Sequence, residues 1–113
     1  MKQQNEMVIF TRTFDLLTWL LPATNHLPRV HRQTFTRRML DCAFTLRERL
    51  EEANLRQEGE RLEKLVQADE ELVKLRFYLR LAAQWTWFSV AQYEHVSKMI
   101  VEIGRLLGGW KRS

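Results

Sequence analysis

The residue types that most often carry catalysis or bind metals are sparse in this chain. It has three histidines, His26, His31 and His95. None of them lies in the Glu-x-x-His spacing of a di-metal helical bundle, and the adjacent Glu94 and His95 point to different sides of a helix. The sequence also lacks an HExxH motif, a glycine-rich phosphate loop, a catalytic triad and the Arg-x4–6-His spacing of helical ribonucleases. We therefore expect no enzyme activity, no cofactor and no metal site.

The arginines indicate a different kind of chemistry. Residues 29–38 include Arg29, His31, Arg32, Arg37 and Arg38, without any acidic residue among them. We expect this run to open the second helix, where basic side chains oppose the helix dipole at a cost of at most about 0.3–1 kcal/mol each. A sequence that accepts this cost favours a role outside the helix. The alternative is an ordinary solvated face.

A second group of arginines lies in the sequence LVKLRFYLRL at residues 72–81. Arg76 and Arg80 are four residues apart and so project from one face of a helix. Arginine favours bidentate contacts with phosphate, which is consistent with a protein that binds the nucleic-acid backbone without base specificity. The alternative is that the two arginines pair with Asp69 or with an acid on a neighbouring helix. Together with the run at residues 29–38, they are our candidate nucleic-acid or partner interface.

Net charge and tryptophan content agree with a binding protein. The chain carries a net charge of +4, which suggests an anionic partner but is modest for a nucleic-acid binder. We expect more exposed aromatic side chains than a bundle of this size needs for its own core, which favours a subunit or partner interface. These are Trp19, Trp85, Trp87 and Trp110.

Composition limits the fold that positions these residues. With 113 residues, 4 Gly, 2 Pro and no alternating apolar pattern, the chain is predicted to be a single all-α domain. Its one cysteine, Cys42, excludes an intramolecular disulfide and lies on an apolar stripe, which predicts a buried structural thiol. No secretory signal and no stretch long enough to span a membrane is visible, so we expect a cytoplasmic protein without membrane contact.

Helical spacing of apolar residues predicts four helices. We expect a flexible N-terminus at residues 1–9 and a single four-helix bundle domain at residues 10–113. Short connections favour an up-down-up-down antiparallel bundle. The first helix is predicted to begin near Phe10 and to be interrupted by Pro22. Its predicted core stripe is Phe10, Phe14, Leu17 and Leu21, widened by Leu16 and Leu20.

The other three helices have clearer core stripes. The second is predicted to bury Phe35, Met39, Cys42, Leu46, Leu50 and Ala53. The third is predicted to bury Leu62, Leu65, Ala68, Leu72, Leu75, Leu79 and Ala82. The fourth is predicted to bury Tyr93, Val96, Ile100, Ile103, Leu107 and Trp110.

Local signals define the fourth helix. Ser89 and Gln92 have the spacing of a capping box at its start. Gly104 costs about 1 kcal/mol relative to alanine inside a helix, which predicts a close approach between two backbones. Gly108 and Gly109 are expected to end the regular helix.

Four sequence segments resemble one known family. LLTWLLP, LPRVHR, LRFYLRLA and QYEHVSKMIVEIGRLLGGW occur in this order within residues 10–112, and together they strongly resemble the accessory variability determinant (Avd) proteins of diversity-generating retroelements. The resemblance implies a four-helix bundle that assembles into a barrel-like homopentamer with a basic surface. It also implies a non-catalytic protein that binds the element's reverse transcriptase and nucleic acid, template RNA or cDNA, and supports mutagenic retrohoming.

The resemblance also assigns residues. Arg76 and Arg80 match the two arginines of the family's LRFxLR helix, and by that resemblance they contribute to the basic face of the pentamer. Arg29, His31 and Arg32 match the basic start of the family's second helix. This chain has only a short basic sequence, KRS, after its last tryptophan, which puts nucleic-acid contacts by a tail in doubt.

Two alternatives remain open. Proteins encoded by intervening sequences of bacterial 23S ribosomal RNA genes have the same fold, and their partner would be ribosomal RNA. The other alternative is a purely structural oligomeric bundle without a nucleic-acid role. Gene context and retention on heparin or DNA resin distinguish these possibilities.

Overall fold

A computed structural model of the chain describes the backbone of residues 2–113 and the side chains of residues 8–113. Within this part the chain is all-α and contains no strand. The long helices are α1 (Lys2–Ala23), α2 (Arg37–Asn54), α3 (Glu58–Gln84) and α4 (Val90–Arg112). Between α1 and α2 lie the 3₁₀ turns η1 (Thr24–His26) and η2 (Arg29–His31) and the π-helical turn η3 (Arg32–Thr36).

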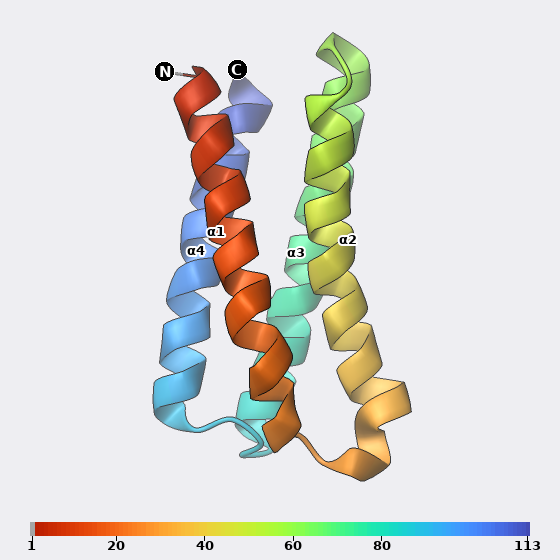
Figure 1. Cartoon of the computed structure of the whole chain (residues 1–113), viewed down its shortest axis with the longest axis vertical. Coiled ribbons are helices and arrows are strands. Elements are labelled where there is room, and N and C mark those ends of the chain that lie inside the picture. The colour runs from red at the N-terminus through yellow and green to blue at the C-terminus, as the bar shows by residue number, and fades with distance from the viewer. Residues whose placement is uncertain (1) are drawn as a thin grey trace.

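The four helices form one elongated bundle of 43 × 25 × 19 Å. Helix α1 lies beside α4 and helix α2 beside α3 (Figure 1). Helix α3 also packs on α4, and α2 contacts α1, so the four helices surround a common core. The two termini lie at one end of the bundle together with the α2–α3 connection, whereas the α1–α2 and α3–α4 connections lie at the other (Figure 1). The sequence-based prediction of a four-helix bundle agrees with this architecture.

Most of the predicted core is confirmed in α2, α3 and α4. In α2 the buried residues include Met39, Cys42, Leu46, Leu50 and Ala53. In α3 they are Leu65, Ala68, Leu72, Leu75, Leu79 and Ala82. In α4 they include Val96, Ile100, Ile103, Leu107 and Trp110. The prediction was wrong at Leu62, which is 46% exposed near the start of α3, while Phe35 and Tyr93 are half-buried.

Cys42 is buried between α2 and α3, as its position on the apolar stripe predicted. Burial raises the pKa of its thiol to about 11, and the nearby carboxylate of Glu71 adds to the increase. The side chain is therefore a protonated thiol at neutral pH and contributes packing.

The prediction for α1 was wrong in two respects. The helix begins at Lys2 and not near Phe10, while Met1 and the side chains of residues 1–7 lie outside the described part. Flexibility of residues 1–9 stays a prediction. The core face is also rotated, because Phe14 is 63% exposed and Leu21 is 50% exposed. The buried residues are Ile9, Thr13, Leu16, Leu20 and Ala23.

Thr13 explains why the core face of α1 was misplaced. Its side chain is buried, and its hydroxyl donates a hydrogen bond to the backbone oxygen of Ile9 over 2.9 Å. This bond satisfies the hydroxyl within the helix, so a polar residue occupies a core position without an unpaired donor. Because Thr13 is polar, the pattern of apolar residues does not include it in the core face. The helix then ends at Ala23, one residue after Pro22, as the proline suggested.

The second helix also begins later than predicted. Residues 29–36 form η2 and η3, and α2 itself begins at Arg37. Pro28 has extended geometry with ψ of 134°, and it provides no N–H for a preceding turn. The next eight residues form a 3₁₀ turn and then a wider π-helical turn before α-helical geometry is established at Arg37. Of the predicted basic helix start, only Arg37 and Arg38 therefore lie in the first turn of α2.

The start of α4 agrees with the prediction, but its end does not. The backbone N–H of Gln92 donates to the Ser89 hydroxyl over 3.1 Å, and the Ser89 N–H donates to the Gln92 side chain over 2.8 Å. Gly108 and Gly109 do not end the helix, which continues to Arg112. The buried ring of Trp110 and an ion pair made by Lys111 hold the last turn, so this tertiary packing outweighs the low helix propensity of glycine.

Gly104 lies against side chains of α3 and not against another backbone, which corrects the predicted approach. A Cβ atom at this position would lie 3.5 Å from Leu72 Cδ2 and 3.7 Å from Arg76 Nη2. A methyl group would fit here in ordinary van der Waals contact, and the Arg76 side chain lies against this position of α4.

Candidate nucleic-acid interface

The predicted basic run forms one exposed surface segment, which we call the basic segment (residues 29–38). Arg29, His31 and Arg32 lie in η2 and η3, and Arg37 and Arg38 begin α2. All five side chains are exposed. Within residues 8–113 none of the four guanidinium groups makes an ion pair or a hydrogen bond to a protein acceptor. These cations are therefore available to an external anion.

An aromatic cluster anchors the basic segment to the end of α3 and to the α3–α4 connection. Phe35 contacts three rings edge-on or tilted, with centroid distances of 5.6 Å to Tyr78, 5.8 Å to Trp85 and 5.2 Å to Trp87. His31 stacks on Trp87 with a centroid distance of 5.3 Å and an interplanar angle of 27°. Contacts of this kind fix a segment that regular helix hydrogen bonds do not hold.

The arginine pair of α3 does not form the ion pair with Asp69 that the sequence suggested as an alternative. Arg76 and Arg80 are exposed, and neither makes an ion pair in the described part of the chain. Asp69 instead accepts a hydrogen bond from Lys111 over 2.9 Å. The alternative interpretation, in which Asp69 neutralises the pair, is therefore wrong.

The structure does not bring the two basic groups into contact. Phe35 of the basic segment packs on Tyr78, whereas Arg76 lies against Gly104 of α4, so the two groups occupy different flanks of α3. The end of α3 and the α1–α2 connection lie at the same end of the bundle, away from the termini (Figure 1). Arg80 lies close to this end of α3, and Arg76 lies one turn further from it, beside Gly104. A ligand that contacts both groups must cross α3.

Four arginines elsewhere in the fold are paired with acids, whereas Arg56, Arg61 and Arg112 make no ion pair within residues 8–113. Arg12 and Arg105 both bind Glu102, at 3.2 and 2.7 Å, and lower the pKa of its carboxyl group, with Arg105 as the larger cause. Arg47 binds Glu51 at 2.8 Å and also lies 5.0 Å from the centre of the Phe10 ring. The contrast with the basic segment supports a role for the latter outside the fold.

The four tryptophans were predicted to be exposed, and the structure agrees only in part. Trp85 is 47% exposed beside the basic segment, and Trp19 and Trp87 are half-buried. Trp110 was predicted to be exposed as well as a core residue, but only 4% of its surface is accessible. The missed feature is that Trp85 and Trp87 surround Phe35. The aromatic content of residues 84–88, unusual for a connection, was the available signal.

Neither a metal centre nor a membrane span is found in the part that the structure describes. No group of three or more His, Cys, Asp or Glu side chains there could hold a metal ion. His95 packs against Trp19 with tilted rings, at a centroid distance of 5.4 Å and an interplanar angle of 43°, and His26 is exposed on η1. None of the helices within residues 2–113 has the length and apolar character needed to cross a bilayer.

Comparison with known proteins places this fold among its relatives. A solved protein of unknown function from Bacteroides thetaiotaomicron, assigned to the S23 ribosomal protein family, superposes with a TM-score of 0.87 and 17% sequence identity. The match covers 96% of this chain and 99% of that one, and at this identity it shows the shared fold alone. No curated protein matches the sequence significantly. Residues 7–113 match the sequence family described as bAvd-like, and the chain therefore belongs to the bAvd-like family.

Proposed function

We propose that this protein is a non-enzymatic accessory protein of a diversity-generating retroelement. In this proposal it binds the element's reverse transcriptase and its template RNA or cDNA, and so supports mutagenic retrohoming. The observation that carries the proposal is the family match over residues 7–113. The exposed, unpaired arginines of the basic segment and of α3 supply the chemistry that such a role requires.

Charge and geometry favour contacts with the nucleic-acid backbone over base recognition. The basic residues that we assign to binding are Arg29, His31, Arg32, Arg37, Arg38, Arg76 and Arg80. They are spread over turns and two helices instead of lining one face of a single helix that enters a groove. Phosphate contacts of this kind position a nucleic acid without reading its sequence. Binding is therefore expected to be largely independent of sequence and strongly dependent on salt.

The proposed assembly is a barrel-like homopentamer of up-down-up-down bundles. A ring of five copies would bring the Arg76 and Arg80 side chains around one axis, where they form a continuous basic face. Two unit charges about 10 Å apart in water repel by only about 0.4 kcal/mol. A hydrated ring of arginines therefore tolerates its own charge, while a polyanion contacts several copies at once. The mass of the native protein, measured by light scattering after size exclusion, tests the pentamer directly.

The decisive experiment removes the arginine pair. We expect Arg76→Gln/Arg80→Gln to lower the affinity for template RNA by about tenfold at 0.1 M KCl and to reduce the salt dependence of binding. The matched control is Arg56→Gln/Arg112→Gln, which removes the same charge from two exposed arginines at the other end of the bundle that make no ion pair within residues 8–113. Equal losses in the two variants would reduce the effect to net charge and would overturn the assignment to α3.

Co-purification separates the retroelement role from its competitor. The structural relative is assigned to the S23 ribosomal protein family, so ribosomal RNA is the alternative ligand to test. We expect the protein to be retained by the reverse transcriptase encoded next to it and to prefer the element's template RNA over a 23S ribosomal RNA fragment of equal length. Retention by the ribosomal fragment alone would contradict the proposal.

A further inference from the structure

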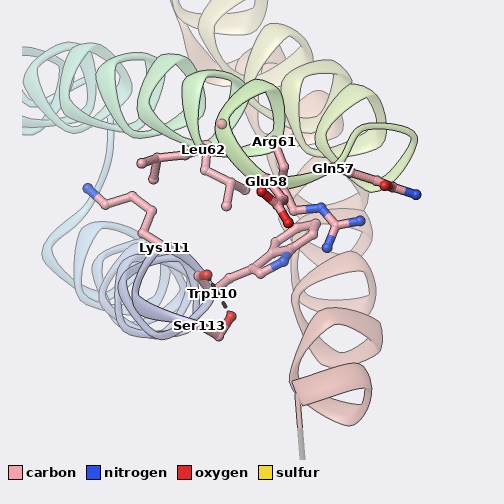
Figure 2. Close-up of a pocket in the computed structure, with 9 residues that line it drawn as sticks. Gln57, Glu58, Arg61, Leu62, Trp110, Lys111 and Ser113 are labelled. Carbon is pink, nitrogen blue, oxygen red and sulfur yellow. Dashed lines mark hydrogen bonds between the residues drawn. The ribbon is translucent and has the colours of Figure 1, made fainter.

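A pocket opens where α3 begins and α4 ends, at the end of the bundle opposite the basic segment (Figure 2). Its volume is about 690 Å³. Its lining comprises Gln57, Glu58, Gly59, Arg61, Leu62, Leu65, Trp110, Lys111 and Ser113. A cavity of this size accommodates a small organic ligand.

Trp110 contributes an unpartnered donor to this pocket. The side chain is 4% exposed, and its Nε1–H makes no hydrogen bond to any residue whose side chain the structure describes. Figure 2 shows the indole reaching across the pocket, with its ring nitrogen on the side of Arg61. The ring is held edge-on against Phe10 at a centroid distance of 6.1 Å. A buried donor without an acceptor is unfavourable, so this N–H would gain from an acceptor that a ligand supplies.

Arg61 presents further donors. Its Nε donates to the backbone oxygen of Ala53 over 3.0 Å, which fixes the guanidinium group, while its two terminal nitrogens make no hydrogen bond within residues 8–113. Lys111 adds a second positive charge beside the pocket and is held by Asp69 at 2.9 Å. Arginine held in this way is suited to a bidentate contact with an oxyanion.

The start of α3 adds a favourable dipole. Glu58 and Gly59, at the first two positions of this 27-residue helix, line the pocket, and the preceding Gln57 provides no side-chain cap. Free backbone N–H groups and the helix dipole both favour an anion at such a position. Among the side chains that line the pocket, the carboxylate of Glu58 is the one acidic group, and it opposes an anion there. The C-terminal end of α4, which also borders the pocket, opposes an anion through its own dipole.

We infer that this pocket binds a phosphate group, with the guanidinium of Arg61 and the Nε1–H of Trp110 donating to its oxygens. Phosphate has enough acceptor oxygens to meet donors that approach from two helices, and the pocket leaves room for the remainder of a phosphorylated molecule. This site is separate from the proposed nucleic-acid interface and would stand if that interface failed.

Indole N–H resonances test the inference on the whole chain. The Trp110 resonance is assigned by its loss in Trp110→Phe, and inorganic phosphate is titrated against chloride at constant ionic strength and pH. We expect a saturable shift of the Trp110 signal and a phosphate-dependent increase in Tm. Arg61→Gln should weaken the apparent affinity about tenfold or more. The matched control Arg56→Gln, an exposed arginine outside the pocket, should leave the affinity unchanged.

Glu58→Gln should change the phosphate affinity in the opposite direction from Arg61→Gln. A gain in affinity cannot be explained by a variant that fails to fold. Removing this carboxylate should strengthen phosphate binding, by about threefold. The inference is overturned if the shift does not saturate, if chloride reproduces it, or if Arg61→Gln and Arg56→Gln behave alike. It is also overturned if Glu58→Gln weakens binding.

The source of the phosphate is distinguished with two oligonucleotides of one sequence, one with a 5′-phosphate and one with a 5′-hydroxyl. A Trp110 shift with the first alone identifies a terminal phosphate, and a shift with both identifies the backbone. A shift with inorganic phosphate but with neither oligonucleotide identifies a small phosphorylated compound. No shift with any of the three overturns the site.

Discussion

The two ends of the bundle present their cations in opposite ways. At the basic end, which we define as the basic segment together with Arg76 and Arg80, the guanidinium groups are exposed, and they make no ion pair with the side chains that the structure describes. At the pocket end, which we define as residues 57–62 and 110–113, Arg61 is fixed by a backbone oxygen and Lys111 by Asp69. The aromatic residues differ too, since Trp85 is exposed at the first end and Trp110 is buried at the second.

This difference predicts two kinds of anion binding. Exposed cations act on a polyanion through long-range attraction, which salt screens strongly. Recessed donors with fixed directions act on a single oxyanion at short range, where screening is weaker. A bundle of this length can therefore separate a broad, salt-sensitive surface from a small, selective site.

The largest expected effect comes from neutralising the basic segment. The variant Arg29→Gln/Arg32→Gln/Arg37→Gln/Arg38→Gln should lower the affinity for RNA by about 100-fold at 0.1 M KCl. The slope of log affinity against log salt should fall by about 3 to 4, because each lost phosphate contact removes roughly one unit. Fluorescence anisotropy across a salt series measures both quantities. Arg61→Gln, at the pocket end, should leave the slope nearly unchanged, and an equal change there would erase the distinction between the two ends.

The next effect concerns how the basic end is held. Phe35→Ala removes a half-buried ring that contacts three other aromatic rings, and we expect a loss of about 2 kcal/mol in the free energy of unfolding. Urea denaturation measures it. Phe44→Ala, a ring on α2 that is 40% exposed, is the control and should cost less than about 1 kcal/mol. Similar losses in both variants would show that the aromatic cluster is not a special anchor.

The core of this protein could be predicted from its sequence wherever apolar residues alone define the period. The core stripe of α4 has this property, and the predicted positions from Val96 to Trp110 are buried. In α1 the period is broken by Thr13, whose hydroxyl is satisfied by the backbone of its own helix. Apolar periodicity cannot show that bond, so the stripe was placed on Phe14 and Leu21, which are exposed.

The candidate site could be predicted only as a set of residues. Charge runs identified the basic segment and the α3 arginines, because charge is visible in sequence. The two groups lie on different flanks of α3 because one flank packs against the basic segment and the other against α4. This packing is a tertiary property that charge runs do not reveal. The pocket end was missed for a related reason. Arg61 and Trp110 are far apart in sequence, and only packing of the α3 start against the α4 end brings them together.

Backbone strain also differs between the ends. Within residues 2–113, two non-glycine residues have positive φ, Glu58 with 48° at the pocket end and Thr86 with 62° near the basic end. This conformation is more strained for a β-branched residue. Thr86→Gly should therefore stabilise the protein by about 1 kcal/mol in thermal unfolding. Glu58→Gly should stabilise it less, because it also loses a favourable carboxylate at the helix N-terminus. A larger gain at Glu58 would reverse this order.

The smallest expected effect is a difference between the two ends in how their local stability depends on pH. Near the pocket end, a hydrogen bond from Lys64 and the charge of Arg49 lower the pKa of Glu52 below its ordinary value of 4.5. A lowered pKa in the folded state stabilises folding above pH 4.5, and this contribution is lost as the pH falls through the folded-state value. The aromatic contacts of Phe35 at the basic end do not titrate.

Acidification from pH 5 to pH 3 should therefore loosen the α2–α3 connection before the basic segment. Amide hydrogen exchange at residues 55–57 should accelerate first, relative to residues 32–36 and after correction for the intrinsic pH dependence of exchange. Glu52→Gln should remove this difference, because the amide carries no charge at any pH in the range. The pair is exposed and screened, so high salt should reduce the effect as well. Faster exchange at residues 32–36 than at residues 55–57 in the unsubstituted protein would contradict this prediction. It would mean that an acid-sensitive contact stabilises the basic end, and not the aromatic contacts of Phe35.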